Sequence, residues 1–218
     1  MKNKISIVLN SIIVILSIIG TIFMLEGIEF MGPEHTLAAT RIEMFKFYTV
    51  DSNILMGVVS AVFIVFELRL IKGKIDIIPT QVYVLKLIGT VGVTLTFLTV
   101  VLYLGHIAEN GFFSMFMNTN LFFHFIIPVL SMITFIFLEK TDQIKFKHTF
   151  IGTTTMLVYA VFYVINILLH IENGKVSPKY DWYWFVQQGI WSMIIVLPLM
   201  IVFTYIISLC LWKLNKKR

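Results

Sequence analysis

Residues 5–25 of the chain read ISIVLNSIIVILSIIGTIFML, a run of 21 residues without a charged side chain. A helix needs about 20 mainly apolar residues to cross the hydrocarbon core of a bilayer, so this run predicts a membrane-spanning helix. Lys2 and Lys4 precede it, as basic residues precede the apolar part of a signal peptide. The run is longer than the apolar part of a signal peptide and lacks a clear cleavage site. We therefore expect it to be retained as the first helix.

Five further stretches meet the same length criterion. The predicted spans are residues 5–25, 47–70, 82–105, 120–138, 150–170 and 189–212. With short loops they use all 218 residues, so we expect a single domain, residues 1–218. The predicted fold class is all-α: a polytopic membrane protein with six transmembrane helices.

The composition excludes several classes of protein. Apolar residues make up 58% of the chain and charged residues 13%, whereas a soluble domain is about 25% charged. This excludes an ordinary soluble enzyme, a disordered protein and a secreted disulfide scaffold. The single cysteine, Cys210, leaves no intramolecular disulfide and no cysteine metal site. We attribute the net charge of +5 to contact with a membrane surface rather than with nucleic acid.

The basic residues predict the orientation of the helices. The two ends of the chain and the second and fourth loops hold 12 lysines and arginines, and Lys86 near the same side brings the count to 13, against four on the opposite side. Because basic residues are retained on the cytoplasmic side, both termini are expected to be cytoplasmic. The count of 13 includes Lys86, which we expect to reach the same surface from one turn inside the third span. The inner halves of the spans are otherwise expected to be apolar.

Polar side chains gather in the outer halves of the predicted spans. In the second span, Thr49, Ser52 and Asn53 follow an i, i+3, i+4 spacing, which places them on one helix face. The remaining polar positions are Thr96, Thr99, Tyr103, His106, Asn120, His124, Tyr159, Tyr163, Asn166, His170, Gln187, Gln188 and Ser192, and His35 lies in a loop on the same side. Because intramembrane polar groups are costly, this convergence predicts a cavity that opens toward the outer leaflet.

Asp51 lies about 200° around the helix from Thr49. We therefore expect its carboxylate to point away from the cavity, toward Arg41 or Lys46. A role in binding a cation is the other reading of this residue.

Most of these residues also have a purely structural explanation. A hydroxyl in a membrane helix usually bonds a carbonyl of its own helix. Tyr103 and Tyr163 fit an interfacial aromatic belt, and His106 and His170 lie at helix ends. His124 is different, because it lies about one turn inside the fourth span and four residues before Pro128, which frees a backbone carbonyl for a buried site.

The sequence contains no GxSxG, Walker, HExxH or dinucleotide-binding motif. It does offer a hydroxyl and a base at matching depths, Thr49 and His124. A hydroxyl becomes an effective nucleophile when a neighbouring histidine takes its proton. Asn53, Asn120 or a tyrosine hydroxyl would then stabilise the oxyanion.

Three motifs resemble those of a known family. Phe-Tyr-Thr49-Val-Asp-Ser52-Asn53-Ile-Leu resembles the family's Phe-Thr-x-x-Ser-Asn-Leu pattern, and His124-Phe-Ile-Ile-Pro128 resembles its His-x-x-x-Pro. Tyr180-Asp-Trp-Tyr-Trp-Phe185 is similar to an aromatic segment before the last span, although it lacks the usual prolines. This is the family of the androgen-induced protein and the androgen-dependent TFPI-regulating protein, which has bacterial relatives.

The resemblance implies an intramembrane threonine hydrolase that cleaves fatty acid esters of hydroxy fatty acids. Carried over to this chain, it implies Thr49 as the nucleophile and His124 as the base. It implies no cofactor and no metal, a fatty-acyl lipid as the substrate, and a place in a bacterial cell membrane, because the Ser52-Asn53 pair matches the bacterial members best. The candidates for binding substrate or the oxyanion are Ser52, Asn53, Asn120, Tyr103, His106, Tyr163, Asn166 and His170. The oligomeric state stays open.

Two other functions are compatible with the same residues. A lipid-binding or transport protein would use the cavity without chemistry, although the sequence lacks obvious inverted repeats. A metal-dependent membrane enzyme would use His106, His124 and His170, with Asp51 as a further ligand, in a spacing that matches no known metal motif.

Overall fold

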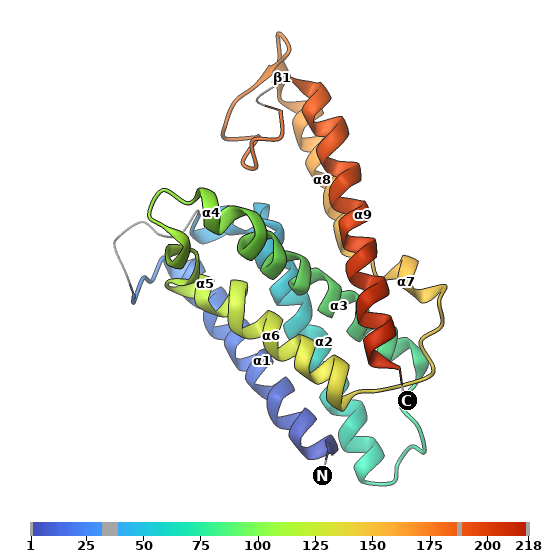
Figure 1. Cartoon of the computed structure of the whole chain (residues 1–218). Coiled ribbons are helices and arrows are strands. Elements are labelled where there is room, and N and C mark those ends of the chain that lie inside the picture. Colours follow the sequence, from blue (N-terminus) through green and yellow to red (C-terminus); the bar gives the residue numbers. More distant parts are fainter. Residues whose placement is uncertain (1, 32–38, 187–188, 217–218) are drawn as a thin grey trace.

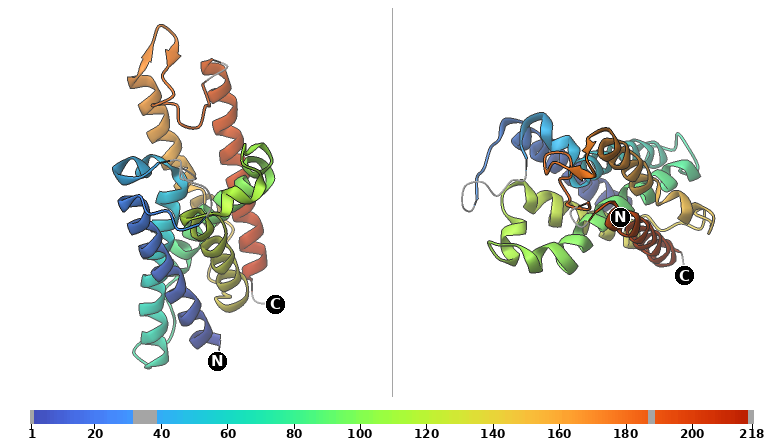
Figure 2. Two further views of the ribbon diagram at one scale, coloured as in Figure 1. Left: turned by 90° about the vertical axis from the view of Figure 1, so that its left-hand side faces the viewer. Right: turned by 90° about the horizontal axis from the view of Figure 1, so that it is seen from above.

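The computed structural model describes residues 2–31, 39–186 and 189–216. This described part is an all-α polytopic membrane protein with six helical spans long and apolar enough to cross a bilayer: Lys2–Glu26, Tyr48–Ile71, Thr80–Ile107, Thr119–Leu138, His148–Leu169 and Ile190–Asn215. Each predicted boundary is confirmed to within three residues. Both termini lie at the same end of the bundle (Figures 1 and 2). We call this the inner end, following the orientation expected from the basic residues, and the opposite one the outer end.

Three spans are single helices: α1 (Lys2–Glu26), α2 (Tyr48–Ile71) and α9 (Ile190–Asn215). The third joins α3 (Thr80–Thr99), the π-helix η2 (Val100–Leu104) and α4 (Gly105–Ile107). The fourth joins α5 (Thr119–Leu121), the π-helix η4 (Phe122–Ile126), α6 (Ile127–Ile133) and the π-helix η5 (Thr134–Leu138). The fifth joins α7 (His148–Ile151) and α8 (Thr154–Leu169).

The loops at the outer end contain short elements of their own. Two are 3-10 helices, η1 (Arg41–Lys46) and η3 (Phe112–Phe116). Beyond α8, strands β1 (Ile171–Glu172) and β2 (Lys175–Val176) pair antiparallel around Asn173 and Gly174, both with positive φ. Asn-Gly is the preferred sequence for such a two-residue hairpin turn. This hairpin lies at the tip where α8 and α9 extend past the other helices (Figure 1).

The inner loops and helix ends follow familiar sequence rules. Gly73 has a φ of +65°, and the amides after α2 bond back to Leu70 O and Arg69 O, which is the Schellman pattern of a helix C-terminus. Pro79 directly precedes α3, where a missing N–H costs nothing. Gly73 thus ends α2 and Pro79 precedes α3, so the loop between the second and third spans is short.

The α3 segment lies at the centre of the bundle. It packs against α2, α6, α8 and α9, and its span is the most buried of the six. Helices α1 and α2 lie close together at Gly57, and near this point the Ser17 hydroxyl donates to Asn53 O at 3.1 Å. Small residues permit this close backbone approach between membrane helices.

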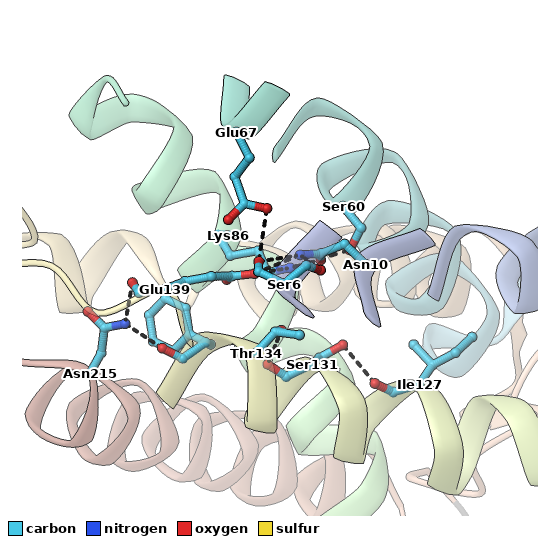
Figure 3. A network of polar contacts seen from close by, with 11 residues as sticks. Ser6, Asn10, Ser60, Glu67, Lys86, Ile127, Ser131, Thr134, Glu139 and Asn215 are labelled. Carbon is cyan, nitrogen blue, oxygen red and sulfur yellow. Dashed lines mark hydrogen bonds and ion pairs between the residues drawn. The ribbon is translucent and has the colours of Figure 1, made fainter. Parts of the chain in front are cut away.

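One sequence expectation about the inner half is wrong. Lys86 does not reach the inner surface: its side chain is fully buried and forms an ion pair of 3.2 Å with Glu139, which is also fully buried. Ser6, Asn10 and Glu67 complete this contact from α1 and α2 (Figure 3). The inner half of the bundle is therefore not purely apolar, because Lys86 finds an internal counter-ion and several oxygen acceptors.

The close approach of α1 and α2 predicts the effect of a methyl group at Gly57. A Cβ there would lie 2.5 Å from Ser17 Oγ and 2.8 Å from Ser17 Cβ, which forces the helices apart. We expect Gly57→Ala to destabilise the protein by about 1–3 kcal/mol, measured as a lower melting temperature in detergent. The double variant with Ser17→Gly should recover most of the loss, and a single variant that melts like the wild type would contradict the close approach.

Candidate active site

A cavity of about 740 Å³ lies in the outer half of the bundle. This volume suits one drug-sized or lipid-sized ligand. The cavity is bounded by the start of α2, the end of α3 with η2, α8, α9 and the loop before α9. Its lining residues are Tyr48, Thr49, Leu95, Thr96, Thr99, Val100, Tyr103, Leu104, Ile107, Met156, Tyr159, Trp182, Tyr183, Trp184, Phe185, Ser192, Val196 and Met200. Mostly apolar walls therefore surround a small set of hydroxyl groups that includes Thr49.

The first turn of α2, which carries Thr49, is fixed by a residue far along the chain. Phe47, the residue before α2, provides no side-chain cap. Instead the Tyr48 N–H donates to the Tyr183 hydroxyl at 2.9 Å. Burial raises the pKa of Tyr183 to about 12, so the hydroxyl is neutral at physiological pH. Tyr183 thus supplies the acceptor that a free helix N-terminus requires.

Helix α8 fixes the residues just before this turn. The Tyr159 hydroxyl donates to Lys46 O and accepts from Trp182 Nε1 at 2.9 Å. The Tyr48 hydroxyl is in turn bonded to Thr155 Oγ1 at 2.9 Å. The start of α2 is therefore held from both α8 and the aromatic segment, which we define as residues 180–186.

Asp181 organises the aromatic segment itself. Its carboxylate accepts the Phe185 N–H at 2.9 Å and the Val186 N–H at 3.0 Å, and it also accepts the Tyr163 hydroxyl. Trp184, inside this turn, has a φ of +61°, a conformation that bulky side chains rarely adopt. Asp181 is only 3% exposed, and its only sequence signal was an acidic residue among aromatic ones.

His124 lies in the π-helix η4, four residues before Pro128. Pro128 cannot donate to the His124 carbonyl and its ring crowds that carbonyl, which explains why the helix widens here. The Nδ1 atom of His124 lies 2.7 Å from Met115 O. A carbonyl oxygen only accepts, so Nδ1 carries the proton and Nε2 of the neutral ring carries the lone pair. His124 is thus in the tautomer that a general base needs.

Asn53 joins the two helices that carry Thr49 and His124. Its Nδ2 donates to Thr49 O at 2.8 Å and to Phe123 O at 3.1 Å. The second and fourth spans are therefore neighbours at this depth. Because both N–H groups of Asn53 are used, the amide holds these two backbones and has no hydrogen to offer an oxyanion. Its Oδ1 atom is buried and has no hydrogen-bond partner among the described residues.

Thr49 and His124 are not in direct hydrogen-bond contact. Among the described residues, the only hydrogen-bond partner found for the His124 ring is Met115 O, and His124 is not among the residues that line the cavity. Its side chain is 7% exposed. The structure thus brings the two helices together but leaves the hydroxyl and the imidazole in different surroundings.

Of the residues predicted to bind substrate or the oxyanion, Tyr103 lines the same cavity as Thr49. Ser52 is buried, donates to Thr49 O at 3.1 Å and lies 3.3 Å from Thr96 Oγ1. Asn120 lies in α5, with its N–H bonded to Met117 O at 3.1 Å. The exposed His106 ring packs beside Phe112.

The other three candidates support the outer loop. Tyr163 is fully buried and donates to Asp181. Asn166 donates to Tyr180 O at 2.6 Å, and the His170 ring stacks on Tyr180 at 3.6 Å between centroids. These residues hold the aromatic segment against α8 and do not line the cavity. His35, Gln187 and Gln188 lie outside the described residues.

The proposed metal ligands do not gather. No three histidine, cysteine or acidic side chains within residues 2–31, 39–186 and 189–216 lie close enough to hold a metal ion. The alternative of a site built from His106, His124, His170 and Asp51 therefore has no cluster in the part of the chain that the structure describes.

The expectation for Asp51 is half right. It does face away from the cavity, into a separate groove of about 540 Å³ between α2, α3 and α8 that shares Tyr48 and Tyr159 with the cavity wall. Among the described residues, neither Arg41 nor Lys46 forms the expected ion pair with Asp51, and Lys46 pairs with Glu43 at 3.1 Å.

No family model, curated protein or solved structure matches the chain.

The hydrogen bond from the Tyr48 N–H to the Tyr183 hydroxyl predicts that this hydroxyl stabilises the start of α2. We expect Tyr183→Phe to lower the free energy of unfolding by about 1 kcal/mol, because the buried Tyr48 N–H loses its acceptor. Hydrogen–deuterium exchange at the Tyr48 amide should become faster. Tyr205→Phe serves as the control, since Tyr205 lies in α9 and stacks on Phe150; equal exchange at Tyr48 in both variants would contradict the assignment.

Proposed function

We propose that the protein is an intramembrane lipid esterase in which Thr49 is the nucleophile and His124 the general base. The observation that carries this proposal is the bridge made by Asn53. One amide nitrogen bonds both Thr49 O and Phe123 O, the carbonyl next to His124. The candidate nucleophile and the candidate base are thereby held on adjoining helical turns, as a shared active site requires.

The environment of each residue supports its role. Thr49 lies on the wall of a large cavity, where a substrate carbonyl can approach its hydroxyl. The contact of His124 Nδ1 with Met115 O corresponds to the contact that orients the base in a catalytic triad. A π-turn at His124 adds to this support, because such turns often occur at functional sites.

In the first half of the reaction, Thr49 Oγ1 attacks the ester carbonyl while His124 Nε2 takes its proton. The proton then passes to the leaving alkoxide as the ester bond breaks, which leaves an acyl-threonine. In the second half, water attacks this acyl group, His124 takes a proton from the water and returns it to Thr49, and the fatty acid leaves. The mechanism requires Nε2 to come within hydrogen-bond distance of Thr49 Oγ1 when substrate is bound, since such contacts often tighten only in the complex.

The cavity wall indicates the class of substrate. Its apolar residues, among them Val196 and Met200, suit an acyl chain. Several of its hydroxyls lie at the start of α2 and at the outer end of the third span, in α3 and at Tyr103 of η2. Tyr103 is the predicted candidate best placed to donate to the oxyanion, because it shares the cavity with Thr49. We therefore propose a fatty-acyl ester, such as a fatty acid ester of a hydroxy fatty acid, as the substrate.

The decisive experiment measures release of fatty acid from such an ester by the protein in lipid nanodiscs. We expect Thr49→Ala to abolish turnover and labelling by a fluorophosphonate probe. We expect His124→Ala to lower kcat by about 10²–10⁴-fold, the usual contribution of a general base. Thr49→Ser should retain part of the activity, because it keeps the hydroxyl.

The matched controls are Thr21→Ala and His148→Ala. The Thr21 hydroxyl bonds Ser17 O of its own helix, and His148 is the first residue of α7, at the inner end, where its Nδ1 accepts from the Lys145 N–H. Both variants should keep full activity. Unchanged turnover and labelling in Thr49→Ala would refute the proposal, and tight lipid binding without turnover in the wild type would identify a lipid-binding or transport protein instead.

A further inference from the structure

A second polar site lies in the inner half of the bundle and has no part in the proposed hydrolysis. It contains Glu67 of α2, Lys86 of α3 and Glu139 at the end of the fourth span, with Ser6 and Asn10 of α1 between them (Figure 3). Each of these residues is at most 3% exposed. Ionisable groups inside a membrane protein are costly and commonly mark sites that bind or move ions.

The ammonium group of Lys86 has no hydrogen left for Glu67. Its three hydrogens face Asn10 Oδ1, Ser60 Oγ at 3.4 Å and Glu139 Oε1 at 3.2 Å. The amide nitrogen of Asn10 is also committed, to Glu139 Oε1 at 2.8 Å and to Ser6. Glu139 therefore receives both of the strong donors in the cluster.

The Ser6 hydroxyl lies between the two carboxyl groups. Its Oγ is 2.9 Å from Glu67 Oε2 and 3.2 Å from Glu139 Oε1. A hydroxyl has one hydrogen and can donate to only one of these oxygens. The other contact would place two oxygens at hydrogen-bond distance with no hydrogen between them, unless that carboxyl group is itself protonated and donates to Ser6.

The charge count leads to the same requirement. Two carboxylates and one ammonium give a net charge of −1 in a site whose residues are at most 3% exposed, and an uncompensated buried charge is strongly destabilising. In addition, Glu139 Oε2 is buried and has no hydrogen-bond partner among the described residues. The cluster is thus short of one positive charge and of hydrogen-bond donors.

We propose that this cluster is a proton-binding site, in which Glu67 carries the proton. Glu67 Oε2–H donates to Ser6 Oγ, Ser6 donates to Glu139 Oε1, and Glu139 stays ionised beside Lys86. The site is then neutral, and every close contact between oxygens contains a hydrogen. Glu67 takes the proton because, among the residues that the structure describes, its one hydrogen-bond partner is Ser6, whereas Glu139 has Lys86 and Asn10.

The groups that face Glu67 come from each neighbouring element. Lys86 and Tyr83 face it from α3, and Glu139 from the end of the fourth span. Helix α1 contributes the uncharged Ser6 and Asn10. Lys86, already paired with Glu139, is the cation in this set.

Infrared spectroscopy of the protein in nanodiscs at neutral pH tests the proposal. A protonated carboxyl group has a carbonyl stretching band that a carboxylate lacks. We expect such a band in the wild type, and we expect it to shift when glutamate is labelled with ¹³C in the side-chain carboxyl, which separates it from any aspartate band. Glu67→Gln should lose the band and keep the wild-type melting temperature, because a neutral amide can replace a neutral acid. Glu172→Gln, on the exposed hairpin, is the control and should keep the band.

Each other outcome overturns the proposal. Absence of the labelled band in the wild type shows that no glutamate is protonated, and its persistence in Glu67→Gln places the proton elsewhere. A Glu67→Gln variant that fails to fold contradicts a neutral Glu67. Spectra in sodium chloride and in choline chloride should be identical; a band that appears only without sodium would mean that a monovalent cation occupies the site.

Discussion

The inner half of the protein depends on the contacts that the ammonium group of Lys86 makes. A buried cation must be surrounded by acceptors, and these come from helices far apart in the sequence: Asn10 of α1, Ser60 of α2 and Glu139 of the fourth span. Glu139 is connected further to α9, since Asn215 Nδ2 donates to Glu139 O at 3.0 Å (Figure 3). Removing Glu139 would leave the ammonium charge uncompensated, and removing Asn10 or Ser60 would leave one of its N–H groups without an acceptor. The arrangement of these helices is therefore constrained by all three acceptors.

The outer half is built on a different principle. There the helices separate around a cavity, and hydrogen bonds from aromatic side chains replace tight packing. Tyr159 and Tyr183 fix the start of α2 from α8 and from the aromatic segment. The inner half is connected by the contacts of Lys86, and the outer half, where Asn53 joins the second and fourth spans, has room for a ligand.

The sequence predicted the parts of this structure that depend on local properties. Span length and hydrophobicity located the helices because the bilayer thickness sets a requirement that each segment meets alone. The i, i+3, i+4 spacing also placed Thr49 beside the face that Asn53 shares with the fourth span. Lys86 was misread because its position near a helix end fits a side chain that reaches the surface, while its true partner, Glu139, directly follows the fourth span. The roles of Asp181 and Tyr183 depend on long-range contacts of the same kind, for which spacing gives no signal.

The π-turn at His124 has a consequence for how this chain tolerates insertions and deletions. A π-turn holds one more residue than an α-turn in nearly the same rotation and rise, so a single deletion within η4 would restore a regular helix and leave the residues on either side on their own faces. A single deletion in a regular α-helical part of the span would instead rotate everything on its outer side by about 100°. A π-turn that was free to move along the helix could absorb such a change, but Pro128 fixes its position. The orientation of the residues in the fourth span therefore depends on the number of residues in it as much as on their identity.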